Sequence, residues 1–552
     1  MIQCAVTIAW TLMSMGDAAT AQRAPRFVMT YPASAYPGPL TGRLILVLAK
    51  KAEPEPRLTI SLRGPAVFGV FVDQLRAGQQ AVIDERSSVG YPSRLADLVP
   101  GEYYAQAIVN VYTRVHRADG HIISVPVNDG TEEWFNIAAG NLYSDVQRIT
   151  VGQGGTVRLS ISHAIPPTQL PANSEWVQHL KIQSQALTRF WGRPTFIHAT
   201  VLLPKGYADH PNVRYPSVYT MGHGVPFFFT TDSSPKPRQA EDRARTGLES
   251  GHEFYRSWTS DRFPRVIGIS LDNQTPYFLG SYSVNSANNG PYGDATVDEI
   301  IPYLEEHFRI IREPYARLIE GASTGGWEAL ALQLQHPDLF GGAWVLQPDP
   351  IDFRHYQMVN IYKDENAFSV PTGPFTTSER PMLRSVEGQV TSTVRQVSLF
   401  EEVLGTHGRS GCQLEAWEAV YGPVGPDGYP VPLWDKITGK IDHAVADYMR
   451  DHGYDLRDYA QRNWPTLGPK IAGKLHFFAG DMDNYHLNLA VYDFQDFLRQ
   501  TTSPHYEAQF TYGRPLKGHS WHAFTWSELV LQLADYIKQR APAGQDIASW
   551  TY

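Results

Sequence analysis

The first part of the chain, from about residue 25 to residue 166, consists of short runs in which apolar and polar positions alternate or β-branched residues cluster. The strongest runs lie at residues 43–48, 58–62, 104–112 and 157–161. Glycine and proline pairs separate them, and no stretch has the three- and four-residue period of a helix. The pattern predicts an N-terminal β-sandwich domain over residues 25–166.

The pattern changes after Pro166. Prolines at 166, 167 and 171 mark a linker, which we expect over residues 167–195. From about residue 196, short apolar runs alternate with amphipathic stretches, which predicts a doubly wound, mostly parallel α/β sheet in a catalytic domain over residues 196–545. The expected strands are residues 199–203, 217–221, 266–270, 317–320, 343–346 and 475–479.

The clearest helix is expected over residues 295–309. Its apolar positions, among them Val297, Ile301 and Leu304, fall on one face at three- and four-residue steps. Asp294 precedes the first turn and is the expected N-cap.

The chain begins with a pattern typical of a secretory signal peptide. Residues 4–13 are apolar, and Ala19, Thr20 and Ala21 stand before Gln22 as small residues do at a cleavage site. No Lys or Arg precedes the apolar stretch, so an ordinary buried N-terminal segment is the alternative. No later run approaches the ~20 apolar residues of a membrane span. We therefore expect removal of residues 1–21 and export to the periplasm or the cell exterior.

Composition narrows the class of protein. A chain of 552 residues is too long for a single small binding module. Acidic residues outnumber basic ones by 56 to 47, a net charge of -9, so a nucleic acid is not an expected partner. Cys4 and Cys412 are the only cysteines, which excludes a disulfide framework and a Cys-based metal site. We expect no cofactor.

A candidate catalytic motif follows the expected strand at residues 317–320. The sequence Gly-Ala-Ser-Thr-Gly-Gly at residues 321–326 is followed by a stretch of helical propensity. This is the G-x-S-x-G nucleophile elbow, in which glycines two positions before and after the serine relieve crowding on a tight strand-to-helix turn. Ser323 is therefore the candidate nucleophile. The backbone N–H of Thr324 would face the oxyanion formed when Ser323 attacks a carbonyl.

An elbow of this type requires an acid and then a histidine later in the chain. Asp481 and Asp483 follow the expected strand at residues 475–479, and His519 and His522 follow a strand-like piece at residues 509–512. One of the two histidines can act as the base. The alternative, a hard-cation site at Asp481, Asp483 and His486, lacks the glycine and glutamate of a calcium loop, so we expect no metal.

With these residues identified, the region from about residue 199 to residue 537 resembles the putative-esterase family of α/β-hydrolases, which includes esterase D, feruloyl esterases and the antigen 85 mycolyltransferases. The similar motifs are residues 202–207 and 215–219, Gly222-His223-Gly224, residues 289–294, the elbow, residues 336–340, residues 480–483 and residues 518–521. The expected fold is thus an α/β-hydrolase domain preceded by the β-sandwich.

The resemblance also implies roles. It assigns Ser323 as nucleophile, Asp483 as acid and His519 as base, with Asp481 and His522 as the second choices. It implies that His223 and Gly224 form an oxyanion loop and that Val225 supplies the second N–H. Aromatic residues that could line a substrate pocket are Tyr292, Tyr485 and Trp521, together with Tyr282 and the Phe227-Phe228-Phe229 run, although each could equally be core. Trp327 is expected to be core.

Two features depart from the family. Residues 349–467 form an insertion before the acid loop, and long insertions beside an active site are often lids. The N-terminal β domain is also not required by the catalytic fold, and a stabilising role is its simplest interpretation.

The expected function is a secreted serine esterase that acts through an acyl-enzyme on a small-molecule or glycan-linked ester. The alternatives are an acyltransferase that uses a sugar or lipid hydroxyl, a peptidase, and a non-catalytic glycan- or surface-binding protein on the same fold.

Overall fold

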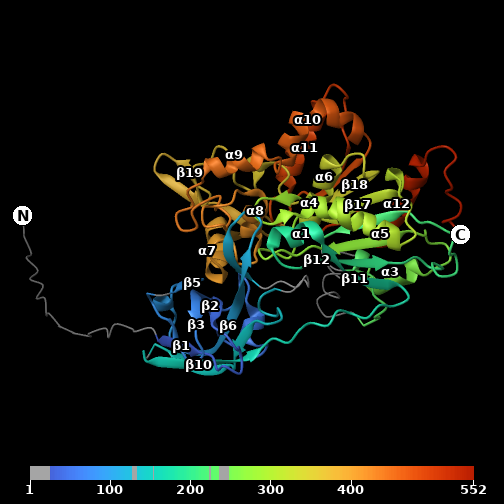
Figure 1. Cartoon of the computed structure of the whole chain (residues 1–552). Coiled ribbons are helices and arrows are strands. Elements are labelled where there is room, and N and C mark those ends of the chain that lie inside the picture. The colour runs from blue at the N-terminus through green and yellow to red at the C-terminus, as the bar shows by residue number, and fades with distance from the viewer. Residues whose placement is uncertain (1–24, 87, 127–133, 153, 223–224, 235–247) are drawn as a thin grey trace, which may run out of the picture.

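The computed structural model describes residues 25–86, 88–126, 134–152, 154–222, 225–234 and 248–552. In the described part of residues 25–166, ten strands pair into one sheet, drawn in blue and cyan in Figure 1. They are β1 (Arg26–Thr30), β2 (Leu40–Ala49), β3 (Ala66–Leu75), β4 (Ala81–Ile83), β5 (Val89–Tyr91), β6 (Gly101–His116), β7 (Ile122–Pro126), β8 (Leu142–Ser144), β9 (Gln147–Val151) and β10 (Thr156–Ala164). The main order is β4-β1-β10-β8-β6-β2-β3-β5, and β7 and β9 pair with β6.

This all-β region differs from the sequence prediction in two ways. A sandwich of two sheets is not confirmed, because hydrogen bonds join all ten strands into one branched sheet. The strand expected at residues 58–62 is not formed, and a 3₁₀ turn over Pro56–Thr59 lies there instead. The reason is local: Pro56 lacks an N–H for a strand ladder, and its fixed φ suits the first position of a helical turn.

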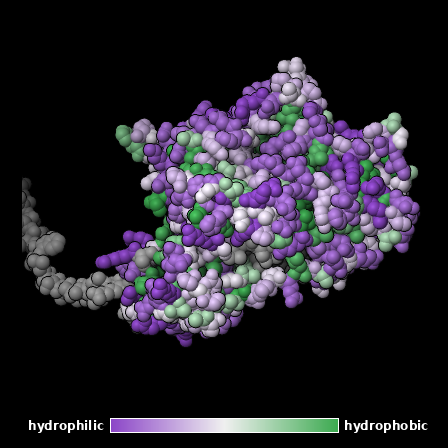
Figure 2. All heavy atoms as spheres, in the orientation of Figure 1, coloured by the Kyte–Doolittle hydropathy of each residue, from purple (hydrophilic) through white to green (hydrophobic). Residues whose placement is uncertain are grey.

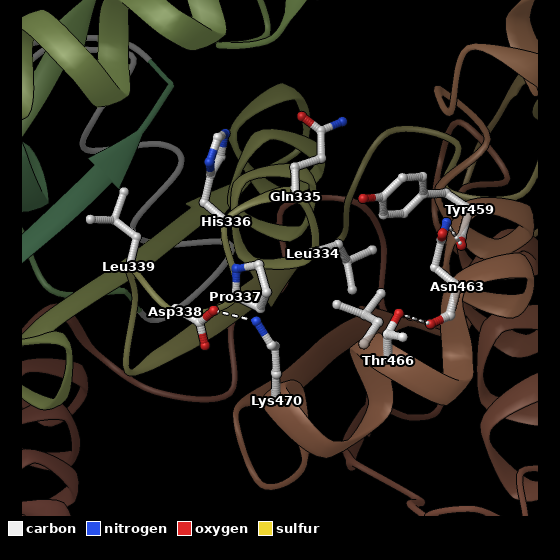
Figure 3. A pocket seen from close by; sticks show the side chains of 11 residues that line it. Leu334, Gln335, His336, Pro337, Asp338, Leu339, Tyr459, Asn463, Thr466 and Lys470 are labelled. Atoms are coloured by element: carbon white, nitrogen blue, oxygen red, sulfur yellow. Dashed lines mark hydrogen bonds and ion pairs between the residues drawn. The ribbon is translucent and has the colours of Figure 1, made fainter.

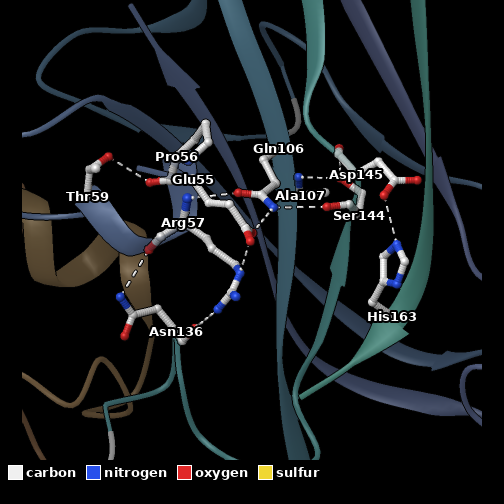
Figure 4. Close-up of polar contacts among 10 residues, drawn as sticks. All are labelled: Glu55, Pro56, Arg57, Thr59, Gln106, Ala107, Asn136, Ser144, Asp145 and His163. Carbon is white, nitrogen blue, oxygen red and sulfur yellow. Dashed lines mark hydrogen bonds and ion pairs between the residues drawn. The ribbon is translucent and has the colours of Figure 1, made fainter. Parts of the chain in front are cut away.

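A polar network fixes the loop between β2 and β3 to β6 (Figure 4). Gln106 of β6 is 1% exposed, donates to Glu55 Oε2 at 2.8 Å and to the Ser144 carbonyl at 3.0 Å, and accepts from the Arg57 N–H at 2.9 Å. Arg57 in turn donates to Glu55 and to the Asn136 carbonyl. Since the amide of Gln106 is satisfied at both ends, it can be buried inside the sheet.

In the described residues from 177 onward, eight strands form the second sheet. They are β11 (Val177–Ser184), β12 (Thr195–Leu202), β13 (Ser217–Met221), β14 (Ile267–Asp272), β17 (Arg317–Ala322), β18 (Gly342–Leu346), β23 (Leu475–Gly480) and β24 (Gln509–Gly513). The order is β11-β12-β14-β13-β17-β18-β23-β24, antiparallel up to β14 and parallel from there on. The predicted α/β sheet, mostly parallel, is confirmed.

Helices connect and cover these strands. They are α1 (Gln185–Trp191), α3 (Gly251–Trp258), α4 (Tyr292–Asp294), α5 (Ile301–His307), α6 (Thr324–Gln335), α11 (Asn488–Arg499) and α12 (Trp526–Arg540). Short strands β15 (Asn285–Ser286) and β16 (Gly290–Pro291) pair before α4. Thus β11 and α1 occupy the range that we expected to be a linker.

The helix expected at residues 295–309 is a helical stretch of mixed type. It begins at Tyr292, widens into a π-helical turn over Ala295–Ile300 and ends with α5 at His307. Pro302 has no N–H to donate to the preceding turn, which favours such an irregularity. Asp294 is therefore not an N-cap; it lies inside the helical stretch and accepts from Asn285 Nδ2 at 2.8 Å.

Between β18 and β23 the chain carries the predicted insertion. It contains the hairpins β19 (Ser369–Gly373)–β20 (Thr376–Glu379) and β21 (Pro381–Arg384)–β22 (Val390–Thr393), followed by α7 (Val394–Leu404), α8 (Gln413–Tyr421), α9 (His443–Asp451) and α10 (Leu456–Ile471). In Figure 1, β19, α9 and α7 lie above the blue sheet, and α10 lies above α6 and β18.

Helix α7 joins the insertion to the ten-stranded sheet. Phe400, Val403 and Leu404 share a buried cluster with Ile45 and Val47 of β2. The alternate residues of β2, such as Leu44 and Leu46, face the sheet's other core, so β2 is buried on both faces. This explains why its sequence is a continuous apolar run instead of an alternating one.

The face shown in Figure 2 is largely hydrophilic, with apolar side chains scattered between polar ones. Within the described residues, no helix has the length and apolar character that crossing a membrane requires.

Candidate active site

Ser323 lies on a sharp turn between β17 and α6. Its backbone has φ 58° and ψ -120°, and α6 starts at the next residue. A non-glycine residue with positive φ is uncommon, and such strain is concentrated at functional sites. The residue is half-buried at the start of the helix. The elbow predicted from the sequence has the expected geometry.

The elbow glycines are required by close backbone approach. A Cβ on Gly321 would lie 2.4 Å from the Gly325 carbonyl oxygen, and a Cβ on Gly325 would lie 2.1 Å from that of Met221. Gly326 approaches the Leu346 carbonyl in the same way, at 2.6 Å. The first turn of α6 is therefore pressed against the ends of β13 and β18.

Replacing Gly325 with alanine should destabilise the protein by about 3 kcal/mol or more, because the added methyl group overlaps a fixed carbonyl oxygen and neither backbone can move easily. Urea unfolding measures the change. Gly38→Ala is the control, since its Cβ would meet nothing closer than 4.0 Å; its free energy of unfolding should change by no more than about 0.5 kcal/mol. Equal stability of the two variants would contradict this account of the elbow.

Asp483, which is fully buried, and His519, which is partly exposed, form a hydrogen-bonded pair. Nδ1 of His519 lies 2.7 Å from Oδ2 of Asp483, and Oδ1 of the same carboxylate accepts from the N–H groups of Tyr485 at 2.8 Å and Leu487 at 3.3 Å. Burial alone would raise the pKa of Asp483, but the charge and hydrogen bond of His519 and these N–H donors outweigh it and lower the pKa. Burial would likewise lower the pKa of His519, and Asp483 reverses this, so that the pKa lies above 6.5.

The second choices for acid and base are placed differently. Asp481 accepts from the Lys517 N–H at 2.8 Å, which fixes the loop that carries His519. The ring of His522 packs against Trp526, and its Nδ1 has no hydrogen-bond partner among the described residues. Burial, assisted by the charge of His519, lowers the pKa of His522 to about 4. The hydrogen-bonded pair is therefore Asp483 with His519.

Sequence reasoning missed Asp349 as a site residue. The Ser323 hydroxyl donates to Asp349 Oδ1 at 3.3 Å, and the Asp349 N–H donates to the Ser323 carbonyl at 3.1 Å. The available signal was positional: Asp349 stands just after β18, as Ser323, Asp483 and His519 stand after β17, β23 and β24. These four strands are parallel neighbours, so their carboxyl ends share one edge of the sheet.

The oxyanion candidates are only partly described. The Thr324 N–H belongs to the first turn of α6, where helix N–H groups have no partner within the helix. His223 and Gly224 lie outside the described residues. Val225, half-buried, follows them at the start of a 3₁₀ turn over Pro226–Phe228. The close approach of Gly325 to Met221 and Gly222 brings the end of β13 beside the elbow.

The aromatic pocket candidates fall into two groups. Tyr292 is 1% exposed, and its hydroxyl donates to the Gln274 carbonyl at 2.8 Å, so it is a core residue in this structure. Tyr282, Phe227 and Phe229 are also buried, as is Trp327, expected to be core. In contrast, Tyr485 is 39% exposed and packs edge-on against the His519 ring. Trp521 and Phe228 also retain exposed surface.

A cavity of about 600 Å³ lies away from this site (Figure 3). It is lined by Leu334 to Leu339 at the carboxyl end of α6 and by residues of α10 that include Tyr459 and Lys470. A helix of α6's length spans about 18 Å, and Ser323 stands at the opposite end. The cavity is therefore not the site of the candidate chemistry.

Residues 194–352 match the family model described as putative esterase. The resemblance indicated by the sequence motifs is confirmed for this segment. It contains Ser323 and Asp349 and ends before Asp483 and His519.

The curated protein YbbA of Bacillus subtilis (strain 168), described as uncharacterized, is 30% identical over 128 residues, 21% of this chain and 51% of YbbA. The chain thus spans about half the length of this relative. Among solved structures, a ferulic acid esterase matches at 17% identity with a TM-score of 0.31, over 66% of this chain and 97% of the other. S-formylglutathione hydrolase FrmB of Staphylococcus aureus matches at 14% identity with a TM-score of 0.33, over 65% and 98%.

Proposed function

We propose, on the premise that residues 194–352 match the putative-esterase family model, that the protein is a serine esterase that works through a Ser323–His519–Asp483 triad and an acyl-enzyme. One observation carries the proposal: a serine on a strained elbow stands at the same sheet edge as a hydrogen-bonded Asp–His pair whose carboxylate is buried. A protein that only binds its ligand has no need of this combination.

In the proposed reaction, the Ser323 hydroxyl turns from Asp349 to His519. Nε2 of His519 takes the proton as Oγ bonds to the ester carbonyl carbon, and the carbonyl electrons move to its oxygen. The N–H groups of Thr324 and Val225 would stabilise that oxyanion. Asp483 holds the ring through Nδ1 and stabilises the imidazolium. When the oxyanion collapses, the alcohol leaves with the proton from His519.

The acyl group then remains on Ser323 until an acceptor attacks it. Water, deprotonated by His519, gives a carboxylic acid and restores the enzyme, and we propose this outcome. Transfer to a sugar or lipid hydroxyl uses the same groups and is the alternative. We further propose that the substrate is a small-molecule or glycan-linked ester, and that the protein is exported, on the strength of residues 1–21.

A fluorophosphonate probe tests the proposal directly. We expect the probe to label the protein at Ser323, with loss of fluoride and formation of one P–O bond, because this reaction requires a serine activated by a base. The labelled peptide is identified by mass spectrometry. Ser323→Ala is the matched control and should remain unlabelled. Lack of labelling in the folded parent protein would favour the non-catalytic binding protein.

A further inference from the structure

Asp349 is the most heavily hydrogen-bonded side chain near the nucleophile. It is 3% exposed, yet its carboxylate accepts from five side chains of the described residues. Oδ2 accepts from Tyr282 Oη at 2.6 Å, Gln413 Nε2 at 3.0 Å, Trp417 Nε1 at 3.2 Å and Thr324 Oγ1 at 3.2 Å, and Oδ1 accepts from Ser323 Oγ at 3.3 Å. One oxygen is thus held by the surroundings while the other faces the reacting hydroxyl.

These donors favour the ionised carboxylate. Trp417 Nε1 and Gln413 Nε2 can only donate, and each donates both to Asp349 Oδ2 and to the Tyr282 hydroxyl. Burial raises the pKa of Asp349 above its ordinary value, and the hydrogen bonds and the charge of His519 limit this rise without reversing it. When ionised, the group places a negative charge beside Ser323, held by neutral donors.

The fold is strained to build this arrangement. Tyr282, which makes the shortest contact, is fully buried and has φ 61°, a left-handed conformation that is rare for a bulky residue. Gln413 and Trp417 come from α8 of the insertion. The N–H groups that start α8, those of Leu414 and Glu415, donate to the carboxylate of Glu401 on α7. The insertion thus contributes directly to the surroundings of the nucleophile.

A serine hydroxyl has one proton and can donate it to one acceptor at a time. We propose that Asp349 is a positioning residue for the reaction proposed above: it holds the Ser323 hydroxyl and the Thr324 peptide in place between turnovers, and its negative charge favours the imidazolium that His519 becomes when Ser323 is deprotonated. The inference rests on the proposed esterase function. It differs from the triad, in which Asp483 alone supports His519.

The charged and titratable groups around His519 determine its pKa and therefore the pH dependence of the reaction. Burial lowers the pKa of His519, and Asp483 and Asp349 both raise it, with a net rise. His522 is neutral near neutral pH, since its pKa is about 4, and Tyr485 contacts the ring edge-on. Arg384 of β21 donates to the Asp483 carbonyl at 2.9 Å. Because only neutral His519 acts as base, the acid limb of kcat/KM should lie above pH 6.5 in the parent protein.

The test is Asp349→Asn, which keeps the shape and removes the charge. We expect kcat to fall about 10- to 100-fold, because the hydroxyl and elbow lose their fixed position. We also expect the acid limb of kcat/KM to move to lower pH, because one anion that raises the pKa of His519 is gone. The readouts are a pH profile with an activated ester and the rate of fluorophosphonate labelling.

Asp352→Asn is the matched control on the same loop. Asp352 is fully buried and paired with Arg354, and Ser323 donates to Asp349 instead. Loss of the Asp352 carboxylate should lower the stability of the protein and leave the acid limb of kcat/KM in place. Should Asp349→Asn fail to fold, Gln413→Met is the second variant. It removes one donor to the carboxylate, which raises the pKa of Asp349 and lowers the ionised share, so the limb should shift in the same direction by a smaller amount.

The outcomes separate the two proposals. An acid limb that moves in Asp349→Asn and not in Asp352→Asn supports the inference. The inference is overturned if the acid limb stays in place in Asp349→Asn, or in Gln413→Met if only that variant folds. In that case, labelling of the parent protein at Ser323 still supports the esterase. Absence of labelling in the folded parent overturns the esterase and the inference together.

Discussion

Replacing Ser323 with alanine should lower kcat for an activated ester by about 10⁶-fold, the loss expected when a triad nucleophile is removed. The attacking oxygen is gone, and Thr324 cannot replace it, because Thr324 is buried and its Oγ1 donates to Asp349 Oδ2. Hydrolysis of a p-nitrophenyl ester measures the change. Any remaining turnover would come from oxyanion stabilisation alone.

The same variant should fold normally. The Ser323 side chain does not cap α6, so alanine removes no capping hydrogen bond. Its φ of 58° strains alanine about as much as serine. Alanine does remove the 3.3 Å hydrogen bond from the Ser323 hydroxyl to Asp349, whose other oxygen keeps its own donors. The melting temperature should therefore be close to that of the parent, and turnover within tenfold of the parent would refute Ser323 as the nucleophile.

Replacing Asp483 with asparagine should lower kcat about 10⁴-fold, as expected when a triad acid becomes an amide. Asparagine keeps the size of the side chain, but its amide can donate to Nδ1 of His519 and so favours the tautomer whose Nε2 carries the proton. Such a ring cannot accept the proton of Ser323. The loss of the anion also lowers the pKa of His519, which Asp483 raises by charge and hydrogen bond.

Asp481→Asn is the control for that prediction. Asp481 lies on the same loop, and its contact is with the Lys517 N–H, which an asparagine oxygen can also accept. Its activity should stay near that of the parent protein. If the two variants lose activity equally in steady-state assays, the acid cannot be assigned to Asp483.

Much of the α/β sheet could be predicted from the sequence, because its central strands are buried on both faces and form short apolar runs between helices. Strand β13 begins and ends where the sequence predicts it. Strand β11 was missed, because this edge strand carries Gln178, Lys181 and Gln183 among its apolar residues and does not form such a run. The bounds of the helical stretch from Tyr292 to His307 were wrong because Asp294 looked like a cap.

The candidate site also contains residues that the sequence could predict and residues that it could not. Ser323, Asp483 and His519 each follow a strand within a short motif, so local sequence identifies Ser323 and limits the acid and the base to two candidates each. The surroundings of Asp349 have no such signature, because Tyr282 and Gln413 lie more than 60 positions away on either side. Only the folded chain brings them together. The choice between Asp481 and Asp483 likewise depends on a contact with His519 that sequence spacing does not define.

The packing of α7 against β2 limits which β domains could replace the ten-stranded sheet in an engineered chimera. The carbonyl groups of Glu402 and Val403 accept from the Arg43 guanidinium at 2.8 and 2.9 Å, and Phe400 packs against the ring of Tyr91. The ten-stranded sheet is therefore not an exchangeable attachment to the eight-stranded sheet. A chimera with an unrelated β domain in its place would have to provide the same contacts for α7. Without them, α8 would lose its fixed position, and Asp349 would lose the hydrogen-bond donors that α8 provides.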